Sequence, residues 1–197
     1  MEEILKMKKL LAQDRPENWE TLPDIELYMD QVVSYLPRQS VGGKVPSMTS
    51  AMINNYVKDS LLPRACGKRY HKEHLIYLTA IGLLKNVLTV RDMKLLLDSE
   101  IREGEESAFY EKFLKGIDEA FEQVNGDIDP ALAEGELTEM AMRLALTSCA
   151  AKTACEELLA IIRAKNPEED PKAKKEKEKE AAKRAKAEKK SEESSGN

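Results

Sequence analysis

The sequence lacks the long apolar runs and the aromatic content that would place it in several large protein classes. No apolar run approaches the roughly 20 residues of a transmembrane helix, so we expect no membrane partner. Aromatic residues make up 5% of the 197 residues, but hydrophobic residues make up 42%, which is enough for a core. The N-terminus is charged and short of apolar length, so it does not resemble a signal peptide and predicts a cytoplasmic protein.

Cysteine is also scarce, and the motifs of common metal sites and enzymes are missing. The three cysteines (Cys66, Cys149 and Cys155) are odd in number and show no disulfide-framework spacing, which fits reduced thiols. Cys66, His71 and His74 could suggest a metal site, but a closed site needs a further ligand. His71 is more simply interpreted as the cap of a following helix. Without a nucleophile–base motif or a phosphate-binding loop, we expect no enzyme, no metal and no cofactor.

Hydrophobic spacing predicts helices along most of the chain, so the expected fold class is mainly α. Asp24, Thr49 (or Ser47) and Thr89 are available as N-caps, and Pro63 must end the helix before it. A two-stranded turn is possible at 63–70. The expected helices cover residues 2–13, 25–36, 49 to before 63, 72–87, 90–101, 107–124 and 137–164.

Composition divides the chain into four parts. An N-terminal extension (1–17) precedes a helical domain (18–101), a helical C-terminal region (102–166) and a charged tail (167–197). The tail has no Val, Ile, Leu, Phe or Tyr, so it cannot bury enough surface to offset its ordering entropy, and we predict that it is disordered. The apolar stripes of 102–166 could complete the core or form a homodimer, and the sequence leaves both possibilities open.

Charge is distributed unevenly. The formal net charge is −5, yet residues 44–94 carry 9 Lys and Arg against 3 Asp and Glu, whereas residues 95–170 carry 7 against 19. A basic island in an acidic chain is typical of a nucleic-acid-binding face. The island includes the stretch INNYVKDSLLPRACGKRYHKEHL, residues 53–75.

This stretch favours a winged helix-turn-helix. The first helix would turn Ile53 and Tyr56 toward the core and present amides and hydroxyls to base edges in the major groove. The basic loop would follow the phosphates, with Gly67 allowing its tight reversal. The loop could equally be an ordinary solvated turn. The candidate DNA-binding residues are Thr49, Ser50, Asn54, Asn55, Lys58, Arg64, Lys68, Arg69 and Tyr70.

The residues from Thr49 through Leu61-Leu62-Pro63 to Gly67-Lys68-Arg69-Tyr70 resemble the MerR-type DNA-binding domain. Together with LPDIELYMDQVVSYL, they are also similar to a bacterial family known as a domain of unknown function (DUF1836), over about residues 18–100. The resemblance implies a MerR-like winged helix-turn-helix at 18–101 and a bacterial source. Asn54 stands where MerR proteins usually have an arginine, and Ser60 replaces the usual turn glycine.

The sequence therefore predicts a protein that binds double-stranded DNA, a transcriptional regulator acting as a homodimer with or without an unknown effector. The alternative is a non-enzymatic helical module that docks a protein partner through its acidic C-terminal helices.

Overall fold

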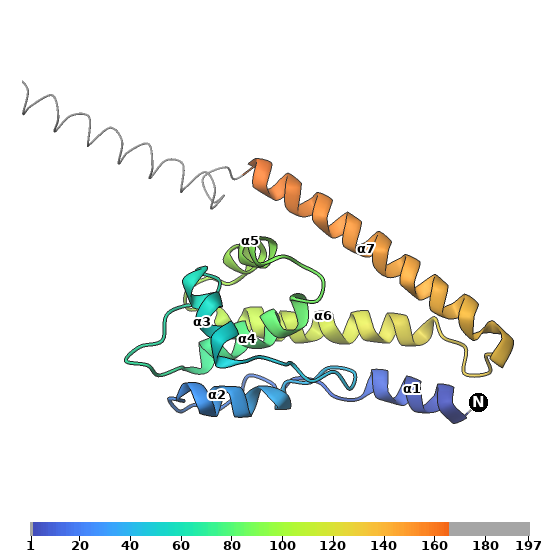
Figure 1. Ribbon diagram of the computed structural model, residues 1–197, viewed down its shortest axis with the longest axis horizontal. Coiled ribbons are helices and arrows are strands. Elements are labelled where there is room, and N and C mark those ends of the chain that lie inside the picture. The colour runs from blue at the N-terminus through green and yellow to red at the C-terminus, as the bar shows by residue number, and fades with distance from the viewer. Residues whose placement is uncertain (1, 166–197) are drawn as a thin grey trace, which may run out of the picture. The chain divides into compact units, whose positions relative to one another are not determined.

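The computed structural model describes residues 2–165, and this part of the chain contains seven α-helices and no β-strand (Figure 1). The mainly-α prediction is confirmed, and the predicted disordered tail at 167–197 lies outside the described residues. Within 2–165, no helix combines the length and the apolar character needed to cross a membrane. The helices are α1 (Glu2–Ala12), α2 (Met29–Tyr35), α3 (Ser50–Lys58), α4 (Lys72–Leu84), α5 (Val90–Glu100), α6 (Glu106–Gly126) and α7 (Leu137–Lys165), with 3-10 turns at Leu36–Arg38 and Glu134–Glu136.

The chain divides into two compact units, and the boundary between them in the sequence falls within α7. The first runs to Lys152 and holds α1 to α6 with the first half of α7. The second begins at Thr153, and its described part is the rest of α7. In that part Leu158 is exposed whereas Leu159 is buried.

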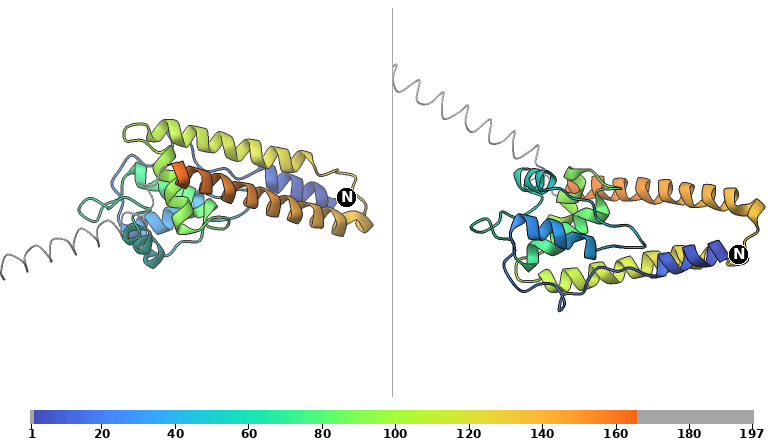
Figure 2. Two further views of the ribbon diagram at one scale, coloured as in Figure 1. Left: turned by 90° about the horizontal axis from the view of Figure 1, so that it is seen from above. Right: turned by 60° about the horizontal axis from the view of Figure 1, so that its bottom comes forward.

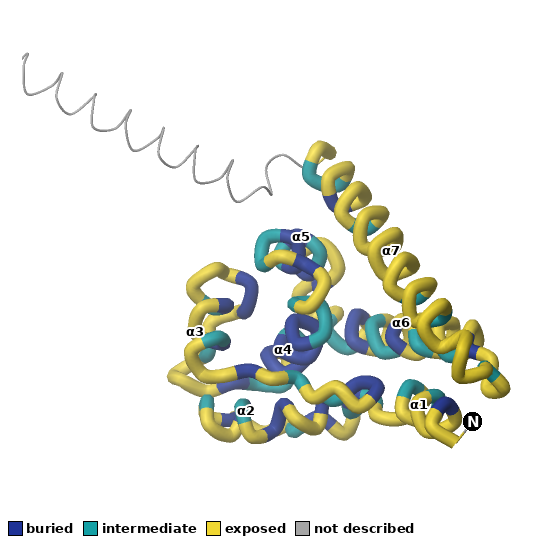
Figure 3. Tube along the Cα trace, turned by 45° about the vertical axis from the view of Figure 1, so that its right-hand side comes forward, coloured by how far each residue is buried: buried dark blue, intermediate teal, exposed yellow. Residues whose placement is uncertain are grey.

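Helix α4 supplies much of the core of the first unit. Eight of its thirteen residues are buried, so it is apolar on all sides rather than along one stripe (Figure 3). The predicted inward positions Leu75, Leu78 and Ile81 are all at most 1% exposed. Thr49 and Thr89 cap α3 and α5 as predicted, because each hydroxyl accepts a hydrogen bond from a backbone N–H three residues later.

The start of α2 differs from the prediction. The helix begins at Met29 rather than near residue 25, and its N-cap is Tyr28 rather than Asp24. The Tyr28 N–H donates to the side chain of Gln31 over 2.8 Å. Residues 25–28 do not continue the helix because Leu27 pairs its backbone with Tyr70. A long-range pairing thus replaces the local helical hydrogen bonds.

A tight turn at Val41–Lys44 packs between α1 and α6, which lie side by side (Figure 2). Gly42 and Gly43 have φ values of +54° and +76°, in the left-handed region that glycine adopts without strain. A Cβ on Gly42 would lie 2.6 Å from the ring of Phe121, and one on Gly43 would lie 2.7 Å from Leu10. Both the backbone conformation and the close packing therefore require glycine here.

A buried polar network joins the segment before α2 to α6. The Tyr35 hydroxyl donates to the Glu17 carboxylate over 2.5 Å, and the Gln39 side-chain amide donates to Tyr35 over 3.1 Å. The hydroxyl of Tyr110, on α6, lies 2.8 Å from the backbone carbonyl of Glu17 and 3.2 Å from the side-chain oxygen of Gln39. Tyr110 is fully buried and Gln39 is 1% exposed, so water cannot replace these bonds. Burial raises the pKa of both tyrosines, which stay protonated.

Tyr110→Phe should lower the free energy of unfolding by about 1–3 kcal/mol, because it removes the one hydroxyl hydrogen that the Glu17 carbonyl and the Gln39 side-chain oxygen share. Urea unfolding followed by circular dichroism measures the change. Tyr56→Phe is the matched control, since Tyr56 is also buried but its hydroxyl makes no hydrogen bond within residues 2–165. Equal losses in the two variants would show that the network does not stabilise the fold.

Candidate nucleic-acid interface

Helix α3 separates its apolar and polar residues as the sequence predicted. Ile53 is fully buried and Tyr56 is 8% exposed. The opposite side presents a hydroxyl, two amides and an ammonium group to solvent. At 100° per residue these polar positions spread over less than half of the helix circumference. The exposed candidates on this face are Ser50, Asn54, Asn55 and Lys58, with Thr49 exposed at the N-cap.

The chain after α3 reverses at a left-handed residue. Ser60 has a φ of +55°, although it is not glycine. Its backbone carbonyl accepts a hydrogen bond from Lys94 of α5 over 2.7 Å, which holds the end of α3 against α5. Leu61 and Leu62 then enter the core, each at most 2% exposed.

The loop at 63–70 makes a second, tighter reversal. Cys66 and Arg69 exchange backbone hydrogen bonds of 3.1 and 2.9 Å around Gly67 and Lys68. Those two central residues have φ values of +57° and +67°, the pattern of a type I′ hairpin turn. The predicted tight reversal at Gly67 is confirmed, whereas the pairing amounts to an isolated bridge rather than two strands.

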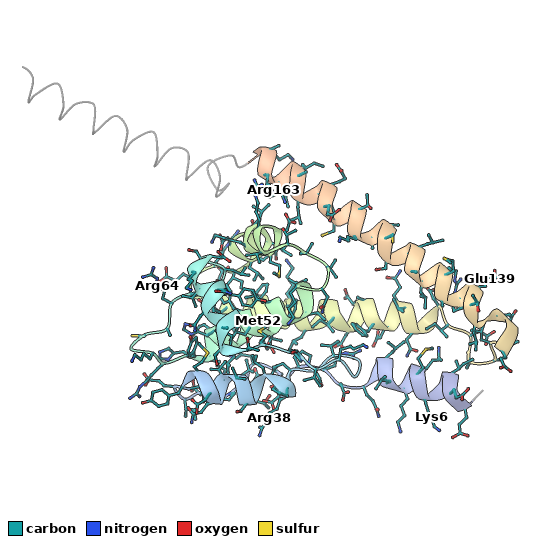
Figure 4. The ribbon with its side chains drawn as sticks, in the orientation of Figure 1. Lys6, Arg38, Met52, Arg64, Glu139 and Arg163 are labelled. Carbon is teal, nitrogen blue, oxygen red and sulfur yellow. The ribbon has the colours of Figure 1, made fainter. Side chains whose placement is uncertain are left out.

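A second bridge fastens this loop to the segment before α2. Leu27 and Tyr70 exchange backbone hydrogen bonds of 2.8 Å each, and both side chains are buried, at 7% and 5% exposed. Tyr70 therefore packs into the core, and its predicted phosphate contact stays a prediction. Arg64, Lys68 and Arg69 remain exposed, and Figure 4 shows Arg64 at the outer edge beside α3.

The cations of the basic island are not equally available. Lys85 donates to the backbone carbonyl of Ser47, and Lys94 is held by Ser60 and Asp98. In contrast, Lys58, Arg64 and Lys68 have no ion-pair or hydrogen-bond partner for their side chains within residues 2–165. These three side chains lie at the end of α3 and in the loop that follows it.

Two aromatic contacts near the loop were not anticipated from the sequence. Arg69 forms an ion pair with Glu26, and its guanidinium lies 5.5 Å from the centre of the Tyr28 ring. The Glu26 hydrogen bond raises the pKa of Arg69, which stays charged. Lys72, the first residue of α4, lies 4.5 Å from the centre of the Trp19 ring. No sequence pattern pointed to these contacts, because they join segments that are more than 40 residues apart.

His74 connects the loop to the start of α4. Its Nδ1 accepts the backbone N–H of His71 over 3.0 Å, and its Nε2 lies 3.4 Å from the carbonyl of Arg64. Its side chain is buried and packs edge-on to the Tyr70 ring. His71 is the N-cap residue of α4, as predicted. Across residues 2–165, no three His, Cys, Asp or Glu side chains are grouped closely enough to hold a metal ion.

The free energy of unfolding should decrease as the pH falls below about 6.5. Burial lowers the pKa of His74 from its ordinary value of 6.5, so the unfolded chain takes up this proton first. Protonated Nδ1 also could no longer accept the His71 N–H. Urea midpoints between pH 5 and pH 7.5 measure the effect. His74→Gln should flatten the dependence and His71→Gln should keep it, whereas a wild-type midpoint that is constant over this range would contradict the prediction.

The comparison with protein families matches residues 17–115 to a family described as a domain of unknown function (DUF1836). No curated protein and no solved structure shows significant similarity to the chain. The matched segment contains α2 to α5, the loop at 63–70 and every member of the buried network from Glu17 to Tyr110. Because the match covers half of the chain, the protein belongs to the DUF1836 family.

Proposed function

We propose that residues 18–101 form a MerR-like winged helix-turn-helix and that the protein is a bacterial transcriptional regulator that binds double-stranded DNA. Helix α3 is the recognition helix in this proposal, and the loop at 63–70 is the wing. The resemblance of these residues to MerR-type domains supports the proposal. So does the position of the exposed cations, which follow directly on the exposed polar face of α3.

The observation that carries the proposal is the conformation of Lys68. A left-handed backbone costs a non-glycine residue about 1–2 kcal/mol, and lysine has no local hydrogen bond to offset this cost. Glycine or asparagine would fit the position better. A lysine in this strained conformation at the exposed tip of a tight turn supports a use for its charge. Phosphate binding is such a use, because an ammonium at a loop tip can approach the DNA backbone.

The two groups of residues would have different roles. Ser50, Asn54 and Asn55 would read base edges in the major groove, since hydroxyls and amides can donate and accept there. Lys58 at the end of α3 would assist them. Arg64, Lys68 and Arg69 would contact phosphates and position the domain without sequence preference.

A dimer completes this proposal, because a single recognition helix reads only one half-site. Helix α7 supports self-association. Its first half exposes Met142 at 59% and Leu146 at 62%, large apolar side chains that a homodimer would cover. The same exposure favours the second candidate function, a module that docks a protein partner through the acidic C-terminal helices.

Lys68→Gly should weaken DNA binding without lowering stability. Glycine relieves the left-handed strain but removes one phosphate contact, so the log–log salt dependence should become shallower by about 0.9. Fluorescence anisotropy at several salt concentrations and urea unfolding measure the two effects. Ser60→Gly is the matched control, because it relieves the same kind of strain at φ +55° and should leave DNA affinity unchanged.

Asn54→Ala should reduce sequence preference rather than overall affinity. Loss of a base contact costs about 1–3 kcal/mol of discrimination, so the ratio of affinities for a selected and a scrambled duplex should fall roughly 5- to 150-fold. The selected duplex comes from a random-sequence pool enriched on the wild-type protein. Failure of the wild-type protein to bind any duplex, even at low salt, would exclude this function and favour the partner-docking module.

A further inference from the structure

Arg69 differs from its basic neighbours because the fold supplies it with an anion. Its guanidinium forms an ion pair with the carboxylate of Glu26, although both side chains are about half exposed, at 48% and 45%. No acidic partner lies within 4.0 Å of Arg64 or Lys68 in the described part of the chain. Glu26 is thus already paired with one of the three cations that the proposed function assigns to phosphate contacts.

The pairing of Leu27 with Tyr70 explains why Glu26 reaches Arg69. In an antiparallel bridge, residues on either side of a paired position point to the opposite face. Leu27 and Tyr70 point into the core, so Glu26, Tyr28 and Arg69 share the solvent-facing side. The ring of Tyr28 lies beside the guanidinium and limits where it can move. The same backbone bonds that hold the loop also hold the carboxylate next to its arginine.

We propose that Glu26 competes with DNA phosphate for Arg69 and thereby sets how tightly the loop holds DNA of any sequence. This regulation rests on the DNA-binding function proposed above. A phosphate that approaches Arg69 meets a carboxylate already in place, and it must displace that carboxylate or share the guanidinium with it. Because the competition involves the phosphate backbone only, it weakens binding to specific and non-specific duplexes equally.

The size of the effect follows from the exposure of the pair. Solvent-exposed ion pairs contribute little, so removing the charge of Glu26 should tighten DNA binding about threefold. Glu26→Gln keeps an acceptor of nearly the same shape and removes the charge. Asp24→Asn is the matched control, because it removes the same charge from an exposed residue of the same segment. Asp24 has no arginine partner within residues 2–165.

The experiment measures anisotropy of the full-length protein on a selected and a scrambled duplex at one moderate salt concentration. Glu26→Gln should raise the affinity for both duplexes by the same factor. Asp24→Asn should change either affinity by at most about half of that factor. In an Arg69→Ala background, Glu26→Gln should not change DNA affinity, because there is then no guanidinium for Glu26 and the phosphate to compete for.

Three results would overturn the competition while the wild type still binds DNA. The first is weaker binding by Glu26→Gln, which would mean that Glu26 orients Arg69 for DNA. The second is an equal gain in affinity from Asp24→Asn. The third is a gain in affinity from Glu26→Gln that persists in the Arg69→Ala background. If the wild type binds no duplex, the DNA-binding function fails first and the competition falls with it. The two failures are therefore distinguishable.

Discussion

The hydrogen bonds among Tyr110, Gln39, Tyr35 and Glu17 are the constraint on which the first unit depends. They join α6 to the start of the family segment and to the end of α2, across 93 residues of sequence between Glu17 and Tyr110. Because Tyr110, Gln39 and Tyr35 are buried, their donors and acceptors must be satisfied inside the protein. The network therefore favours the observed placement of these segments, and α4 contacts both α6 and the 3-10 turn at Leu36–Arg38. The candidate interface is built on this fixed base.

The bridge between Leu27 and Tyr70 has a comparable role at the surface. It ends the helical tendency of residues 25–28, buries two apolar side chains and fixes the loop at 63–70 to the start of α2. It also brings an acidic segment beside a basic one, so Glu26 and Arg69 meet. A single pair of backbone hydrogen bonds therefore decides both the geometry of the loop and the charge that it presents.

Charge alone overstates how much of the basic island can bind an anion. Lys85 and Lys94 donate to the backbone carbonyls of Ser47 and Ser60, and Arg69 has a carboxylate partner. Lys58, Arg64 and Lys68, which have no such partner within residues 2–165, lie at the end of α3 and in the following loop, where a recognition helix and wing would need them. This arrangement is the physical basis for proposing DNA binding in a protein whose overall charge is negative. Membership of a family of unknown function neither adds to that proposal nor weakens it.

The sequence by itself determined the positions of most helices, the caps of α3, α4 and α5, and the division of α3 into an inward and an outward face. These features depend on residues within about four positions of one another, which sequence spacing records directly. It also predicted the reversal at Gly67. The tertiary structure alone decided that α2 starts late, that Tyr70 belongs to the core and that Glu26 faces Arg69. Each of these depends on the pairing of Leu27 with Tyr70, a contact between distant segments that leaves no periodic trace in the sequence.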